Sequence, residues 1–140
     1  MTTADKKSNE IRVMLGEGLK VSAEFKGFIV EADQPVHQGG AGAAPSPFDY
    51  FLASIATCAG FYALAFCKER GIPYDRLGVV MRTERGEVSK MIDRITIEVS
   101  LPPDFPARYR FALVKAIEHC SVKNHILRAP EFAVVTKETP

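Results

Sequence analysis

Three cysteines, Cys58, Cys67 and Cys120, are the side chains of this sequence best suited to covalent chemistry. A cysteine thiolate is a strong nucleophile, whereas a protonated thiol in apolar surroundings is inert. Free cysteine is among the most buried residue types, so each of the three, taken singly, is first interpreted as core packing. Their odd number and wide separation argue against a disulfide scaffold and indicate a reducing compartment.

Metal chemistry is disfavoured by the spacing of the possible ligands. No Cys-x-x-Cys pair occurs, and His37, His119 and His125 do not stand at ligand spacing from the cysteines. We therefore expect neither a metal nor a cofactor. Two of these histidines flank Cys120, but neighbouring residues on a helix point about 100° apart, so neither is assigned as its base.

Hydrophobic periodicity predicts the elements that must position the thiols. Alternation of apolar and polar residues predicts half-buried strands. These strands are expected over Ile11–Leu15, Leu19–Phe25, Phe28–Ala32, Leu77–Glu84, Arg94–Leu101 and Phe132–Thr136. A loop rich in Gly, Pro and Ala, DQPVHQGGAGAAPSP, follows the third strand and is interpreted as a connection or an active-site lid.

A long helix is predicted from Ser46 to Arg70. Ser46 at the N-cap, a proline next and Asp49 at the third helical position form a capping box, and Gly71 ends the helix. Asp49 is interpreted as a capping residue, with a catalytic role as the alternative. Because Cys67 lies nine residues after Cys58, it is placed on the opposite side of this helix.

The long helix carries no formal charge from Tyr50 to Cys67, so a membrane span is the alternative to a core helix. Polar and small residues within it, such as Ser54 and Gly60, favour the core. A second helix is predicted after Phe105, with an apolar stripe that ends at Cys120. The order β-β-β-α-β-β-α-β predicts one α+β domain over residues 1–140, with residues 1–10 flexible.

Composition narrows the class of partner. Of 140 residues, 18 are Lys or Arg and 17 are Asp or Glu, which leaves a net charge of +1. Binders of nucleic acid or of anionic membranes carry a basic excess gathered on one surface, so we expect neither partner. The first residues, MTTADKKSNE, are polar and unlike a signal peptide, and we expect a cytoplasmic protein.

Two segments resemble the OsmC/Ohr family of thiol peroxidases. APSPFDYFLASIATC, which ends at Cys58, is similar to the family segment that carries the reactive cysteine. HCSVKNHIL is similar at Cys120-Ser121-Val122 to the second family landmark. The resemblance extends from about Ile11 to about Lys137 and is closest to the less characterised OsmC-like branch.

The resemblance implies an OsmC-like fold, an intertwined homodimer and a peroxidase that reduces organic hydroperoxides. Cys58 would attack the peroxide and become a sulfenic acid, and Cys120 would then form a disulfide with it. A dithiol reductant, such as a lipoyl group, would restore both thiols. Cys67 would take no part.

Departures from the family pattern leave a second function open. Ohr-type members carry an arginine in an early strand that activates the thiol, but this sequence has no arginine between Arg12 and Arg70. Arg82 and Arg85 are possible substitutes, although exposed strand and hairpin positions explain them as well. Phe48 stands where Ohr-type proteins have glutamate. The alternative function is a non-enzymatic dimer that senses redox state or binds small hydrophobic molecules.

Overall fold

The computed structural model describes residues 9–140, so most of the segment 1–10 that was expected to be flexible lies outside the described residues. The chain forms two compact units, divided between Ala53 and Ser54 within its long helix. Each unit is described by itself below, and the single domain expected over 1–140 stays a prediction.

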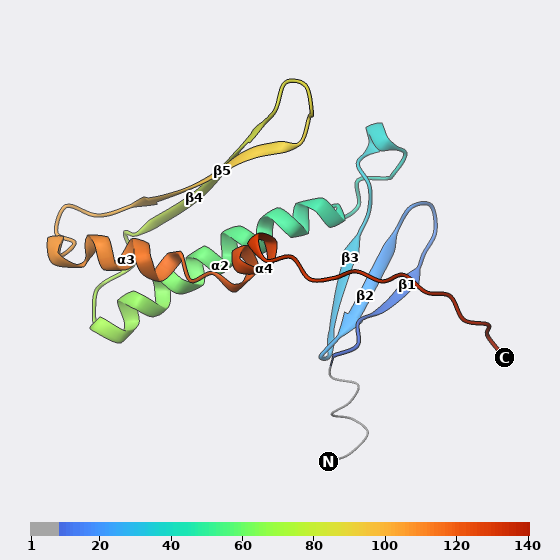
Figure 1. Cartoon of the computed structure of the whole chain (residues 1–140), viewed down its shortest axis with the longest axis horizontal. Helices are drawn as coiled ribbons and strands as arrows, with labels where there is room; N and C mark the ends of the chain where they lie inside the picture. Colours follow the sequence, from blue (N-terminus) through green and yellow to red (C-terminus); the bar gives the residue numbers. More distant parts are fainter. Residues whose placement is uncertain (1–8) are drawn as a thin grey trace, which may run out of the picture. The chain divides into compact units, whose positions relative to one another are not determined.

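The first unit contains a three-stranded antiparallel sheet in the order β1-β2-β3 (Figure 1). Its elements are β1 (Arg12–Leu15), β2 (Val21–Phe25), β3 (Phe28–Ala32) and a short 3₁₀ helix, η1 (Val36–Gln38). Ala23 of β2 stands opposite Val13 of β1 and Val30 of β3. The β2–β3 turn needs two residues at positive φ, and Lys26 (49°) and Gly27 (80°) adopt it.

The second unit begins within α2 (Pro47–Arg70) and adds a β-hairpin and two short helices (Figure 1). Its further elements are β4 (Gly78–Arg85), β5 (Ile92–Ser100), the 3₁₀ helix η2 (Ala107–Tyr109), α3 (Arg110–Ile117) and α4 (Ser121–Leu127). β4 and β5 pair antiparallel, with Val79 opposite Val99 and Met81 opposite Ile97.

One hydrophobic core joins α2, α3 and the hairpin. Its buried members are Ala59, Ala63, Phe66, Cys67, Ile72, Phe105, Leu113 and Ile117, and half-buried residues of β4 and β5 pack against them. The alanines of α2 have side chains short enough to let neighbouring elements approach closely. Leu113 is fully buried, which contributes about 1.5–3 kcal/mol relative to an exposed leucine.

The α+β class, the N-terminal strands, α2 and the β4–β5 hairpin confirm the sequence predictions. Two details were wrong. The second helix is interrupted: α3 ends at Ile117, and α4 starts at Ser121. The predicted last strand, Phe132–Thr136, is absent, because among residues 9–140 no strand pairs with it and a strand needs a hydrogen-bonded neighbour.

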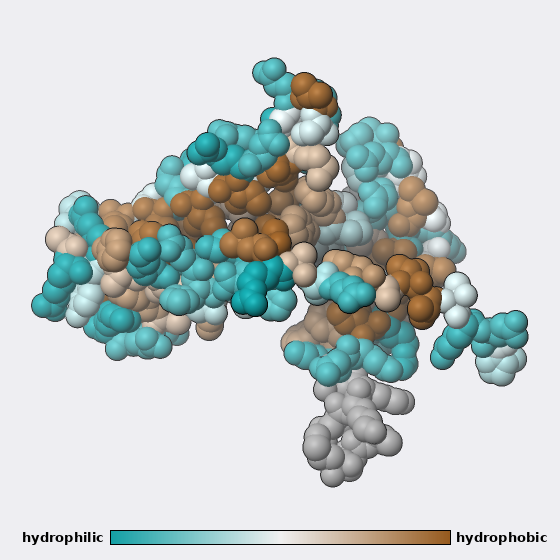
Figure 2. Space-filling model, in the orientation of Figure 1, coloured by the Kyte–Doolittle hydropathy of each residue, from teal (hydrophilic) through white to brown (hydrophobic). Residues whose placement is uncertain are grey.

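Apolar side chains stay exposed in both units (Figure 2). On α2 the exposed ones include Phe48, Phe51, Phe61 and Leu64. Within residues 9–140, α2 is also the one helix that is long and apolar enough to cross a membrane. That property rests on length and composition alone, and core helices of soluble proteins share it.

Candidate functional site

Local signals at the start of α2 fix where this helix begins and therefore where Cys58 lies. The N–H of Asp49 donates to Ser46 Oγ over 3.2 Å, and the N–H of Ser46 donates to Asp49 Oδ2 over 2.9 Å. This reciprocal pair is the predicted capping box. One residue further, the Tyr50 hydroxyl donates to the carbonyl of Glu31 over 2.6 Å and ties the first turn of α2 to β3.

The structure brings the thiols of Cys58 and Cys120 together within the second unit, where each shifts the pKa of the other. Cys58 is half-buried on α2, and Cys120 is only 2% exposed. No disulfide joins them, and both are free thiols. The two residues lie 62 positions apart in the sequence, so packing of α2 against the α3–α4 segment brings them together.

The interruption of the helix between α3 and α4 supplies the other donors to Cys58. Cys120 is the N-cap of α4, so the next N–H groups of the chain have no partner within that helix. The N–H groups of Ser121 and Val122 and the Ser121 hydroxyl, at the start of α4, act on the Cys58 thiol and lower its pKa.

These donors change the acidity of Cys58. Burial raises the pKa of Cys58, but the hydrogen bonds from Cys120, Val122 and Ser121 together lower it below its ordinary value. A donor stabilises the thiolate because the negative sulfur accepts more strongly than the neutral one. All these donors are neutral. The lowered pKa of Cys58 therefore arises without the early-strand arginine of Ohr-type proteins, which this sequence lacks.

The pKa of Cys120 shifts in the opposite direction, upward. Burial raises the pKa of Cys120, and donating its proton to Cys58 raises it further. The N–H of Lys123, 3.3 Å from the Cys120 sulfur, only partly offsets this. The arrangement therefore favours a thiolate at Cys58 beside a thiol at Cys120.

Cys67 lies apart from this pair, as its place on the helix predicted. It is 0% exposed in the core of the second unit, where burial raises the pKa of its thiol. A protonated and inaccessible thiol does not react, so Cys67 belongs to packing.

The other polar residues considered from the sequence have structural contacts. Arg82 forms an ion pair with Glu98 across the β4–β5 hairpin at 3.0 Å, and Arg85 donates to the carbonyl of Lys90 over 2.9 Å. His125 Nδ1 lies 2.6 Å from the carbonyl of Ser121 one turn earlier on α4. Within residues 9–140, no three His, Cys, Asp or Glu side chains gather as a metal site requires.

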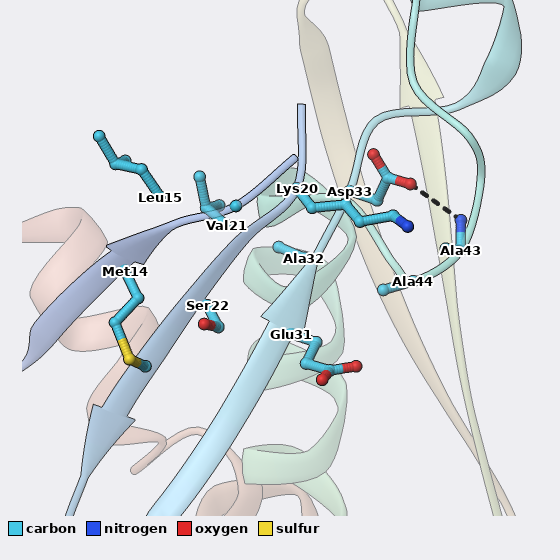
Figure 3. Close-up of a pocket in the computed structure, with 11 residues that line it drawn as sticks. Met14, Leu15, Lys20, Val21, Ser22, Glu31, Ala32, Asp33, Ala43 and Ala44 are labelled. Carbon is cyan, nitrogen blue, oxygen red and sulfur yellow. Dashed lines mark hydrogen bonds between the residues drawn. The ribbon is translucent and has the colours of Figure 1, made fainter. Parts of the chain in front are cut away.

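Sequence reasoning missed the buried carboxylate of Asp33, which is 1% exposed at the end of β3. It accepts N–H groups of Gln34 (2.8 Å), Ala43 (3.0 Å) and Ala41 (3.2 Å) from the loop that follows. Figure 3 shows the bond from Ala43. The Ala43 N–H contributes most to lowering the pKa of Asp33, against the opposing effect of burial. An acidic residue directly before a Gly- and Ala-rich loop was the available signal.

Asp33 also borders a cavity of about 270 Å³ over the sheet of the first unit, with Lys20 and Glu31 on its walls (Figure 3). The loop next to it is tightly packed. A Cβ at Gly40 would overlap the carbonyl oxygen of Gln34, so only glycine fits there. Asp33 thus fixes the course of the loop that leads into α2.

Comparisons with known proteins show the family and the fold. A family model described as "OsmC-like protein" matches residues 39–135. Among solved structures, one from Psychrobacter arcticus, named for osmotic stress induction and a detoxification response, is 18% identical, covers 89% of this chain and 87% of its own, and has a TM-score of 0.67. An OsmC-like protein from Mycoplasma pneumoniae is 16% identical, with 86% and 87% covered and a TM-score of 0.65.

A third solved structure, an organic hydroperoxide resistance protein OsmC from Legionella pneumophila, is 18% identical, with 84% and 88% covered and a TM-score of 0.53. No curated protein matches the sequence. At such identities the structural likeness shows a shared fold.

Proposed function

Since this chain belongs to the OsmC-like family, we propose that it is a thiol-dependent peroxidase that reduces organic hydroperoxides. One observation carries the proposal: two free thiols, Cys58 and Cys120, lie together in the second unit, and their pKa values shift in opposite directions, Cys58 downward and Cys120 upward. A peroxidase of this kind needs one thiol that ionises readily and a second that stays protonated until it is needed.

In the first step, the Cys58 thiolate attacks one oxygen of the peroxide, and the O–O bond breaks. A sulfenic acid forms on Cys58, and the leaving alkoxide takes up a proton to become an alcohol. Cys58 is oxidised by two electrons, and the peroxide is reduced by two. The N–H groups of Ser121 and Val122 lower the pKa of Cys58 and so favour the thiolate that this attack requires.

In the second step, the Cys120 sulfur attacks the sulfenic sulfur, a disulfide forms between Cys58 and Cys120, and the sulfenic oxygen leaves as water. Because the thiols already lie together, this step needs little movement and has a high effective concentration. In the third step, a dithiol such as a lipoyl group reduces the disulfide and becomes a disulfide itself.

An apolar neighbourhood favours organic hydroperoxides over hydrogen peroxide as substrates. Within about one helical turn of Cys58, α2 carries Ile55, Phe61 and Tyr62, of which Ile55 is buried and Phe61 is 58% exposed. An alkyl or aryl group gains free energy by burying against such side chains, which hydrogen peroxide cannot do.

The test is a turnover assay with cumene hydroperoxide and dihydrolipoamide. We expect many turnovers by the native chain, no peroxide reduction by Cys58→Ser, and one turnover at most by Cys120→Ser. Cys67→Ala is the matched control and should keep full activity. Mapping of the oxidised protein should find a Cys58–Cys120 disulfide, and a Cys58–Cys67 disulfide would contradict the mechanism.

The absence of any arginine between Arg12 and Arg70 favours a second candidate, a non-enzymatic dimer that senses redox state or binds small hydrophobic molecules. In that case the native chain would consume one equivalent of peroxide and then stop, with dihydrolipoamide unable to restart it. The same assay therefore separates the two functions.

We further propose a homodimer in the cytoplasm. Support for the dimer comes from the exposed apolar side chains of α2 and from the unpaired segment Phe132–Thr136, where Phe132 and Val134 are at least 85% exposed. Support for the cytoplasm comes from three cysteines that are all free thiols.

A further inference from the structure

A cavity at the C-terminal end of α2, away from the thiol pair, is lined by three arginines. Its volume is about 230 Å³. The charged wall consists of Arg70, Arg76, Arg108, Asp75 and Asp104. The rest of the wall is largely apolar and stiff, with Ile72, Tyr109 and several prolines. All these residues belong to the second unit.

Arg70 and Arg108 both lie against Tyr109. The guanidinium of Arg108 is 4.8 Å from the centroid of the Tyr109 ring, and that of Arg70 is 5.8 Å from the same centroid. Arg70 also stacks on Phe66 at 3.7 Å. Stacking occupies the flat face of a guanidinium and leaves its N–H edge free to bind a planar anion.

Protein carboxylates neutralise these two cations only in part. In the described part of the chain, no carboxylate lies within ion-pair distance of Arg108. Arg70 donates to the carbonyl of Phe66 over 3.3 Å and has one loose contact, 3.6 Å, with Glu69, whose side chain is 75% exposed. Two like charges beside one ring repel each other, and an anion between them would relieve that repulsion.

The third arginine is already paired. Arg76 donates from one nitrogen, Nη2, to both carboxylate oxygens of Asp104, at 2.6 and 2.7 Å. Asp75 opposes an anion, but three arginines against two aspartates still leave the wall positive.

We propose that this cavity is a binding site for a small organic carboxylate. Its carboxylate would bind the N–H edges of Arg70 and Arg108, and its apolar part would lie against Tyr109 and the prolines. At about 30 Å³ per water-sized group, the volume accommodates a molecule of about eight such groups, the size of a benzoate ion. Prolines lose little entropy when a ligand orders them, so the site is largely preformed.

The test is a calorimetric titration of the reduced full-length protein with benzoate and with benzamide, which has the same shape without the charge. We expect benzoate to bind and benzamide to bind at least tenfold more weakly. Arg108→Gln should weaken benzoate binding at least tenfold. Arg110→Gln is the matched control, because Arg110 is exposed and lies outside the cavity, and its affinity should equal that of the native protein.

Three results would overturn the proposal: no heat of binding up to ~10 mM benzoate, equal affinity for benzoate and benzamide, or equal loss in the Arg108 and Arg110 variants. Inorganic phosphate serves as the probe for general anion binding. If it competes with benzoate at equal concentration, the apolar wall contributes nothing and an organic ligand is excluded. The assay does not depend on peroxidase activity, so its outcome leaves the proposed function open.

Discussion

At Cys58 and Cys120, identical side chains acquire opposite acidity from their hydrogen-bond partners. The pKa of Cys58 is lowered by Cys120, Val122 and Ser121, whereas burial and Cys58 raise the pKa of Cys120 against the smaller opposing effects of the Lys123 and Val122 N–H groups. The sequence predicted both cysteines through a family resemblance, but it did not predict the donors. Apolar spacing runs without interruption up to Cys120, so nothing in it signals that α3 stops before this residue and frees N–H groups.

The first prediction concerns Ser121→Ala. This change removes one hydroxyl donor to Cys58 and should raise the pKa of that thiol. The alkylation rate of Cys58 by iodoacetamide, measured against pH, should then move to higher pH, with a fall of up to about tenfold at neutral pH. Ser100→Ala, at an exposed position on β5, is the control. An unchanged pH profile of alkylation in Ser121→Ala would show that the Ser121 hydroxyl does not affect the pKa of Cys58.

At the scale of elements, α2 was predictable because its signals are local. The N-cap, the acid at the third position and the glycine after Arg70 act within a few residues of each helix end. The strands were predictable from alternation for the same reason. The last strand could not be predicted in this way, since a strand depends on a hydrogen-bonded partner from anywhere in the fold or from a second chain.

The second prediction tests whether Asp49 is a cap or a catalyst. Asp49→Asn weakens the contact with the Ser46 N–H and should cost about 0.5–2 kcal/mol in the free energy of unfolding, measured with urea. Peroxide reduction should stay within about twofold of the native rate, because a capping residue does not touch the thiols. Asp93→Asn, outside any helix, is the control for stability. A hundredfold loss of rate at unchanged stability would assign Asp49 to catalysis instead.

The third prediction concerns the loop after β3. Asp33→Asn removes the charge that accepts three N–H groups and should lower the melting temperature at neutral pH by about 5 °C or more. Because the pKa of Asp33 is lower in the folded chain than in the unfolded one, its stabilising effect is complete above the unfolded pKa. It is lost as pH falls through the folded pKa.

The difference in stability between native and Asp33→Asn proteins should therefore shrink in strong acid. Urea unfolding at neutral pH and near the lower end of aspartate titration measures it. A difference that stays constant with pH would show that the carboxylate charge does not hold the loop.

At the scale of the whole molecule, the sequence indicated that α2 is apolar but did not predict which of its apolar side chains are exposed. An apolar helix needs cover on every side. Within each unit, however, α2 keeps phenylalanines exposed: Phe48 and Phe51 in the first unit, and Phe61 in the second. A second copy of the chain is the partner that both the family resemblance and this surface favour.

The fourth prediction is that this chain is an obligate homodimer. Sedimentation at micromolar concentration should show a dimer, and its interface should bury more than about 2,000 Å². Dilution should unfold the protein together with dissociating it. Phe61→Glu should reduce dimer formation. Glu118→Gln, at another exposed position of the second unit, should leave dimer formation unchanged. A folded native monomer would contradict the dimer.

Because Cys67 is completely buried, the reactivity of its thiol reports whether the core of the second unit is folded. A thiol reagent such as Ellman's reagent reaches only thiols that solvent can reach, so the number of groups released reports accessibility as well as oxidation. In reduced native protein the reagent should react with the half-buried Cys58 and release one group, and attack of the buried Cys120 on the resulting mixed disulfide should release a second. A denaturant should then expose Cys67 and release the third. In oxidised protein no thiol should react until the protein unfolds, and then only Cys67 should react. The same assay therefore distinguishes oxidation of Cys58 and Cys120 from unfolding of the core.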